Sequence, residues 1–257
     1  MSEVRQYENR QLAYVDILGW SEACCNPKKS ADELYKVLEP IYQPSEEYNE
    51  GQRIKIRNEG DTRRPSLKHR YGVFSDCFVF SVPIGSGTNG MLFEVAKIAR
   101  KLLSEGFLCR GAVIQGSVFH QDNLIFGPDM VRAVNLEKKT CYPRILCDFK
   151  VVESAQERGN APIIRDPNGV DVIDIFSPCL VTSPLNADKL ENYFNLSAII
   201  KKIQDNLTTL KNEPILDKWK YARDMTIISL SQWGSAAAPF IEKLEKTRGK
   251  TKDRCRH

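Results

Sequence analysis

Two aspartates that lie far apart in the chain could together bind divalent cations. Asp16 closes the apolar run 11–17, which predicts a buried strand. Asp76 lies between two short apolar runs, a pattern typical of a β-hairpin. If the strand and the hairpin pair, both carboxylates reach the same edge of one sheet. Such a pair suits Mg²⁺ or Mn²⁺, which take oxygen ligands and keep positions open for phosphate oxygens, as in two-metal nucleotidyl transfer.

The residues after Asp16 fit a phosphate site as well. In Leu18-Gly19-Trp20 the glycine predicts a tight turn whose backbone amides could approach a triphosphate. The alternative is that each aspartate is simply a turn residue, because Asp is common in turns. Spacing alone leaves both interpretations open.

Other catalytic chemistries have little to use in this sequence. The eight cysteines contain no Cys-x-x-Cys pair, and the three histidines are His69, His120 and His257. A zinc centre or a Ser/His/Asp triad is therefore not expected. Any chemistry must depend on carboxylates, Arg and Lys.

Composition predicts an ordinary globular protein. The chain has 257 residues, of which 42% are hydrophobic and 27% charged, and no apolar run approaches the ~20 residues that span a bilayer. No secretory signal is evident, so we expect a soluble, cytoplasmic protein with reduced thiols and no membrane partner. The net charge of +4 arises within residues 242–257, where seven basic and three acidic residues occur. We interpret this end as a solvated basic tail rather than a nucleic-acid contact.

Periodicity and turn signals predict an α+β chain. Strands are expected at 11–17, 71–74, 77–82, 107–119, 142–147 and 170–176, and helices from the Ser30/Glu33 capping box to Pro40 and at 91–103, 127–139, 190–210 and 215–230. Gly111 and Gly116 interrupt the strand 107–119, which indicates bulges or close backbone approach. The order predicts a ferredoxin-like core, an antiparallel sheet with helices on one face, followed by extra C-terminal helices. We predict one domain with core motifs in 11–147, an insertion at 43–68, a helical extension at 185–245 and a basic tail at 246–257.

Five segments in succession carry a resemblance to a known family. They are Ala13 to Trp20, Phe74 to Asp76, Arg110 to Ala112 with Gly116, Gly127 to Glu137, and Tyr142 to Ile145. In this order they resemble the motifs of class III nucleotidyl cyclases, most closely the stand-alone pyrimidine (uridylate or cytidylate) cyclases of bacterial Pycsar anti-phage systems. The insertion 43–68 is longer than is usual in that class, and the C-terminal third matches nothing in it.

The resemblance implies roles for individual residues. Asp16 and Asp76 would bind two Mn²⁺ or Mg²⁺ ions together with the carbonyl of Ile17, and Leu18, Gly19 and Trp20 would wrap the triphosphate. Purine cyclases carry an Asn and, four residues later, an Arg on the helix after Gly127; the equivalent positions here are Val131 and Asn135. The cation that stabilises the transition state must then come from elsewhere or be absent. Arg132, Arg110 and Arg144 are the candidates, and Arg132 can share a helix face with Asn135.

The residues expected at the base differ from the purine pattern. The Lys and Asp that select a purine are missing, and Tyr71 could fill the room beside a smaller base while Asn123 offers its amide. Tyr71 could equally be an ordinary strand aromatic. We therefore expect conversion of UTP to 3′,5′-cyclic UMP and pyrophosphate, with CTP to cyclic CMP as the alternative. The family base rate, and no residue, favours UTP.

The resemblance also implies partners. Family members form head-to-tail homodimers with sites at the interface, and a separate effector responds to the cyclic nucleotide during phage defence. Because the helix lacks the usual Asn and Arg, a second hypothesis is a catalytically degenerate nucleotide-binding homodimer. A third is a purine cyclase with an unfamiliar base contact.

Overall fold

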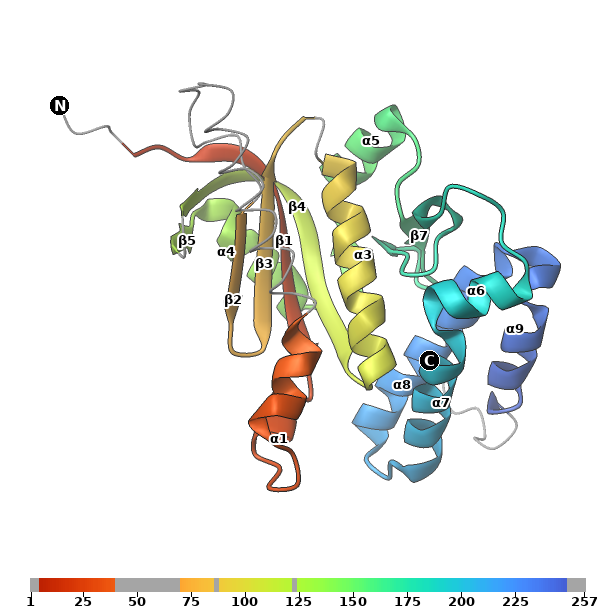
Figure 1. The fold of residues 1–257 in the computed structure, drawn as a ribbon. Coiled ribbons are helices and arrows are strands. Elements are labelled where there is room, and N and C mark those ends of the chain that lie inside the picture. Colours follow the sequence, from red (N-terminus) through yellow and green to blue (C-terminus); the bar gives the residue numbers. More distant parts are fainter. Residues whose placement is uncertain (1–4, 40–69, 86–87, 122–123, 249–257) are drawn as a thin grey trace, which may run out of the picture.

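A mixed sheet built around β1 (Glu8–Leu18) forms the centre of the molecule (Figure 1). The computed structural model describes residues 5–39, 70–85, 88–121 and 124–248. Within these ranges the strand order is β2-β3-β1-β4-β6-β8-β7, and β5 pairs with the end of β4. β1 pairs antiparallel with both β3 and β4, whereas β6 joins β4 in parallel. The order β2-β3-β1-β4 is the ferredoxin-like arrangement, so the predicted α+β core is confirmed.

The remaining elements follow in chain order. The strands are β2 (Arg70–Phe74), β3 (Cys77–Pro83), β4 (Leu108–Gln121), β5 (Leu124–Phe126), β6 (Ile145–Cys147), β7 (Ile163–Arg165) and β8 (Asp171–Ile173). The helices are α1 (Trp20–Cys24), α3 (Thr88–Glu105), α4 (Pro128–Lys138), α5 (Phe149–Arg158), α6 (Ala187–Phe194), α7 (Leu196–Thr209), α8 (Glu213–Ser231) and α9 (Ala238–Glu245), and residues 31–39 are also helical.

Helices cover both faces of the sheet, so the predicted placement on one face is wrong. Ala13 and Val15 of β1 face the core that includes α3, whereas Leu12 packs in a second cluster with Ala133 of α4. Successive side chains of a strand point to opposite faces of the sheet, and β1 is apolar at successive positions. Both faces of the sheet are therefore apolar, and helices bury both of them. Asp16 lies four positions after Leu12 on β1, so its side chain points to the same face of the sheet, the face that α4 covers.

Two glycines allow α4 and β1 to approach β4. A Cβ on Gly111 would lie 2.3 Å from the backbone oxygen of Tyr14, and one on Gly116 would lie 2.0 Å from a carboxylate oxygen of Asp129. The predicted close backbone approach is confirmed at Gly111, whereas at Gly116 the close neighbour is a side chain, the carboxylate of Asp129. Asp129 uses the space to accept a hydrogen bond from the Ser117 amide at 2.6 Å.

The C-terminal helices form their own apolar cluster against one end of the sheet. It contains Leu108 of β4, Phe176, and buried residues of α6 to α9, and Leu18 of β1 packs on it. The predicted helix 190–210 is divided into α6 and α7, because Asn195 adopts the left-handed conformation with φ of 54°. Asn is among the few residues that accept this conformation, and it ends the first helix there.

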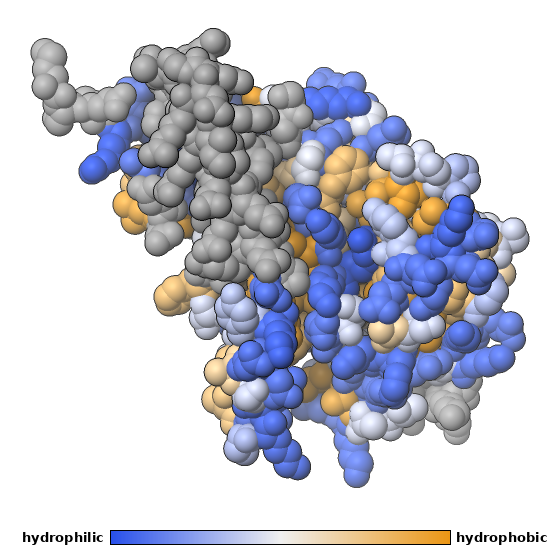
Figure 2. Space-filling view, viewed as in Figure 1, coloured by the Kyte–Doolittle hydropathy of each residue, from blue (hydrophilic) through white to orange (hydrophobic). Residues whose placement is uncertain are grey.

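The capping box predicted at the start of the first long helix is confirmed. The capping box is present: the Ser30 amide donates to Glu33, and the Glu33 amide donates to the Ser30 hydroxyl. The predicted insertion 43–68 and most of the basic tail 246–257 lie outside the described residues. In the parts of the chain that are described, no helix is long and apolar enough to cross a membrane. The face in Figure 2 is largely hydrophilic over α3 and α6.

Candidate active site

The sheet brings Asp16 and Asp76 to the same end. Asp16 is the third residue from the end of β1, and Asp76 lies in the turn between β2 and β3. The Ile17 amide donates a hydrogen bond to the backbone oxygen of Asp76 at 2.6 Å, which fixes the hairpin tip beside β1. Both aspartates are only partly exposed. Two carboxylates next to a backbone carbonyl are oxygen donors of the type that Mg²⁺ and Mn²⁺ prefer.

Arg110 connects Asp16 to a buried glutamate. Arg110 on β4 stands opposite Asp16 in the antiparallel register, and its Nε donates to Oδ2 of Asp16 at 3.3 Å. The same nitrogen forms an ion pair with Oε1 of Glu137, a residue of α4 that is 3% exposed. One guanidinium therefore serves two carboxylates from different elements.

Charges from three elements act on Asp16. Burial raises the pKa of Asp16; the charge of Arg110 opposes this rise, and that of Asp76 adds to it. The charge of Lys218, on the C-terminal helix α8, lowers the same pKa. The negative charge of Asp76 therefore lies close enough to Asp16 to act on it, as a site that binds cations requires. Lys218 is half-buried beside Trp219, a member of the C-terminal cluster.

The turn after β1 has the conformation that its glycine predicts. Gly19 has φ of 82° at the start of α1, a region that favours glycine. The Trp20 side chain packs on Phe107, with ring centroids 5.4 Å apart, so only the backbone of Trp20 could face a phosphate. Leu18 leans on the C-terminal cluster. The packing of Leu18 before Gly19 and of Trp20 after it thus fixes the position of the turn.

On α4, Arg132 is held by its own chain and Asn135 is exposed. Arg132 Nε donates to Asp129 at 2.6 Å, Nη1 donates to Asp148 at 2.8 Å, and Nη2 donates to the backbone oxygen of Gln115 at 2.8 Å. These bonds join α4 to β4 and to the start of α5. Asn135 lies one turn further along the helix.

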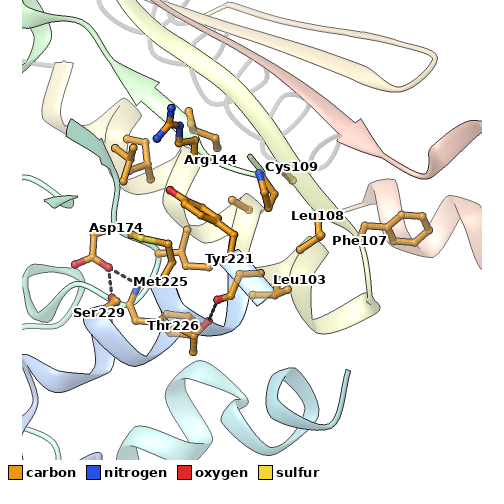
Figure 3. Close-up of a pocket in the computed structure, with 18 residues that line it drawn as sticks. Leu103, Phe107, Leu108, Cys109, Arg144, Asp174, Tyr221, Met225, Thr226 and Ser229 are labelled. Atoms are coloured by element: carbon orange, nitrogen blue, oxygen red, sulfur yellow. Dashed lines mark hydrogen bonds between the residues drawn. The ribbon is translucent and has the colours of Figure 1, made fainter. Parts of the chain in front are cut away.

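Arg144 belongs to a different neighbourhood. Its side chain donates to Thr140 at 3.0 Å and forms an ion pair with Asp166. It also lines a cavity of about 80 Å³ between the sheet and α8, which neither Asp16 nor Asp76 lines. Figure 3 shows Tyr221 extending toward Arg144 and Asp174 bonded to Ser229 on the other side of this cavity.

The residues expected at the base cannot be placed. Tyr71 is part of β2, but its side chain lies outside the described structure, as does all of Asn123. In the described residues no group of three or more His, Cys, Asp or Glu side chains could hold a metal ion. A cation at Asp16 and Asp76 would therefore take its other ligands from the backbone, water or phosphate.

Two residues at this site were not predicted. Glu137 follows Ala133 by four positions, so helical spacing alone could have placed it on the buried face of α4. Lys218 has no signal in the sequence, because its position depends on how the C-terminal helices pack. Both bring charge to the carboxylate end of the sheet.

Comparisons with known proteins give cyclases of similar structure. No protein-family model matches the sequence, and no curated protein matches it significantly. The solved structures that resemble the chain include the guanylyl cyclase Cya2 (13% identity, TM-score 0.36, 65% of this chain and 91% of that chain), the adenylyl cyclase CyaB from P. aeruginosa (16%, 0.39, 66% and 95%), and the guanylyl cyclase domain of the RhoGC fusion protein from the aquatic fungus Blastocladiella emersonii (11%, 0.37, 66% and 96%).

Proposed function

We propose that the chain is a nucleotidyl cyclase of class III type that acts on a pyrimidine nucleoside triphosphate. The observation that supports this most is the meeting of Asp16 and Asp76 at one end of the sheet, where the Ile17 amide bonds to the Asp76 backbone. Asp16, Asp76 and the carbonyl of Ile17 would hold two Mn²⁺ or Mg²⁺ ions. When bound, these ions supply the charge that activates the 3′-hydroxyl and stabilises the leaving pyrophosphate.

The chain's own residues would do the rest by positioning and charge. The turn at Leu18, Gly19 and Trp20 would bind phosphate oxygens through backbone amides. The 3′-hydroxyl attacks the α-phosphate in line, and a nearby cation stabilises the charge that develops on it. Arg110 suits this role better than Arg132, because it lies on β4 directly opposite Asp16, whereas the three donor groups of Arg132 are bonded to acceptors elsewhere in the chain.

The preferred substrate is UTP, giving 3′,5′-cyclic UMP and pyrophosphate, with CTP as the alternative. The test is mass spectrometry of products after incubation with each of the four nucleoside triphosphates, with Mn²⁺ and with Mg²⁺. Asp16→Asn and Asp76→Asn are the matched inactive controls. Cyclic UMP or cyclic CMP in the wild type alone supports the proposal. Faster turnover of ATP or GTP would favour a purine cyclase, and no product from any of the four would favour a degenerate nucleotide-binding homodimer.

We also propose a head-to-tail homodimer whose sites form between subunits. Phe74, two residues before Asp76, is 81% exposed, and Val131 near the start of α4 is exposed as well, so the hairpin and α4 each leave an apolar side chain uncovered. The test mixes Asp16→Ala protein with Asn135→Ala or Arg132→Ala protein. Recovery of activity on mixing two inactive variants would support a site shared between chains. No recovery would mean that the site is built within one chain, or that the α4 residue tested does not belong to it.

In this proposal the product acts outside the enzyme. A cyclic pyrimidine nucleotide would serve as a second messenger in anti-phage defence, read by a separate effector protein. The check is a plaque assay in cells that carry the gene for this chain together with the gene for an effector activated by a cyclic pyrimidine nucleotide. Asp16→Asn should abolish any protection.

A further inference from the structure

The buried carboxylate of Glu137 has no role in the chemistry outlined above. Its α4 position faces the sheet, one turn after the fully buried Ala133, where an apolar residue would pack at lower cost. Charged side chains are rarely buried to this degree unless they are paired. Among the described residues Oε1 forms an ion pair with Arg110, and this oxygen accepts no hydrogen bond from those residues.

The position of Arg110 conflicts with cation binding at Asp16. The guanidinium donates to Oδ2 of Asp16, one of the oxygens that a divalent ion would need. An ion arriving there must displace the guanidinium, and the two positive charges then repel each other. Arg110 thus competes with the ion for one carboxylate.

Glu137 gives Arg110 a second carboxylate with which it can pair. It contacts the same guanidinium nitrogen from the α4 side, so Arg110 can leave Asp16 and keep a negative partner. We propose that Glu137 is a positioning residue that holds Arg110 and thereby allows divalent ions to bind at Asp16. This inference rests on the proposed function, because it concerns the same carboxylates.

The inference makes opposite predictions for the two partners. Glu137→Gln keeps the shape of the side chain but removes the charge that retains Arg110, so Arg110 pairs more strongly with Asp16 and Mn²⁺ affinity falls about tenfold. Removing Arg110 frees Asp16 and raises Mn²⁺ affinity. Because Arg110→Gln alone would leave Glu137 buried without its cation, the double variant Arg110→Gln/Glu137→Gln provides the cleaner comparison.

The experiment is a Mn²⁺ titration followed by electron paramagnetic resonance, without nucleotide. The set comprises the wild type, Glu137→Gln, the double variant, Asp16→Asn, and Glu157→Gln as a control at an exposed carboxylate of α5. Circular dichroism and urea unfolding verify that each variant is folded, and the uncharged Glu137→Met replaces Glu137→Gln if the latter is not. We expect weaker binding in Glu137→Gln, binding at least as tight as the wild type in the double variant, and no change in the control.

The outcomes separate this inference from the proposed function. If Asp16→Asn binds Mn²⁺ as the wild type does, the metal site itself is refuted. If Asp16→Asn binds weakly but Glu137→Gln binds normally, only the role of Glu137 is overturned. If the double variant is as weak as Glu137→Gln, Glu137 acts on the ion directly and not through Arg110, which also overturns the inference.

Discussion

Replacing Arg132 by alanine tests whether this residue holds the fold or serves the reaction. Its guanidinium donates to Asp129, Asp148 and the Gln115 backbone, which ties α4 to β4 and to α5. A hydrogen bond to a charged group contributes about 1.5–3 kcal/mol when buried. The Arg132 side chain is 38% exposed, so water screens these bonds and rehydrates the acceptors in the variant. We therefore expect Arg132→Ala to lower the free energy of unfolding by about 2 kcal/mol.

The loss should come mainly from Asp148, whose side chain is 8% exposed and which also caps α5 by accepting from the Val151 amide at 3.0 Å. Urea unfolding measures the effect as a lower midpoint at unchanged slope. Lys138→Ala, at an exposed site on the same helix, should change the free energy of unfolding by less than about 0.5 kcal/mol. A double-mutant cycle of Arg132→Ala with Asp148→Asn should give a coupling of about 1 kcal/mol.

Lysine is a poor replacement for Arg132, because one ammonium cannot reach three acceptors that a planar guanidinium bonds together. Arg132→Lys should recover less than half of the lost stability. An Arg132→Ala protein as stable as the wild type would contradict a structural role for these three bonds. If that stable variant has also lost turnover, Arg132 serves the reaction and the bonds to its own chain contribute little.

Three further predictions concern two residues of β4 and one residue of α8. Gly116→Ala should lower the free energy of unfolding by about 1–3 kcal/mol, because its Cβ would displace the Asp129 carboxylate from the Ser117 amide and Arg132, which hold it. Gly90→Ala, with open space in a helix, should be neutral or stabilising in the same urea assay. Burial lowers the pKa of His120 to about 3, so below about pH 6.5 the unfolded chain takes up a proton at this residue that the folded chain does not. The free energy of unfolding should therefore fall by about 2 kcal/mol from pH 6.5 to 5. If His120→Gln shows the same dependence of the free energy of unfolding on pH as the wild type, this prediction is contradicted. Lys218→Met should raise the KM for the nucleoside triphosphate severalfold by removing a positive charge near the carboxylates, and an unchanged KM would show that Lys218 does not meet the substrate.

Local patterns predicted the elements that carry the two aspartates. Alternation and turn residues were sufficient for β1, for the hairpin with Asp76 at its tip and for α3, because each of these has a strong period and a clear stop. Short elements such as β7 and α5 were missed. The signal there is a few residues long, and their placement depends on pairing with β8 and packing against β4.

The face on which a helix packs was harder to predict than the helix itself. Nothing in the period of α4 tells which side of the sheet it covers, and the answer follows only from Leu12, Ala112 and Ile114 forming a second apolar face. The same limitation hid the pairing of Arg110 with Glu137. Neither residue stands out in the sequence, and they come into contact only because α4 packs on β4.

The C-terminal helices are connected to the candidate site even though no site residue was predicted in them. Leu18 and Leu108, which flank Asp16 and Arg110 on neighbouring strands, both pack in the C-terminal cluster. A disturbance of that cluster would therefore reach the strand ends that hold the carboxylate and its guanidinium, since packed cores transmit strain. Lys218 adds charge to the same place from α8. The sheet supplies the acidic groups, and the helical extension fixes the end of the sheet where they meet.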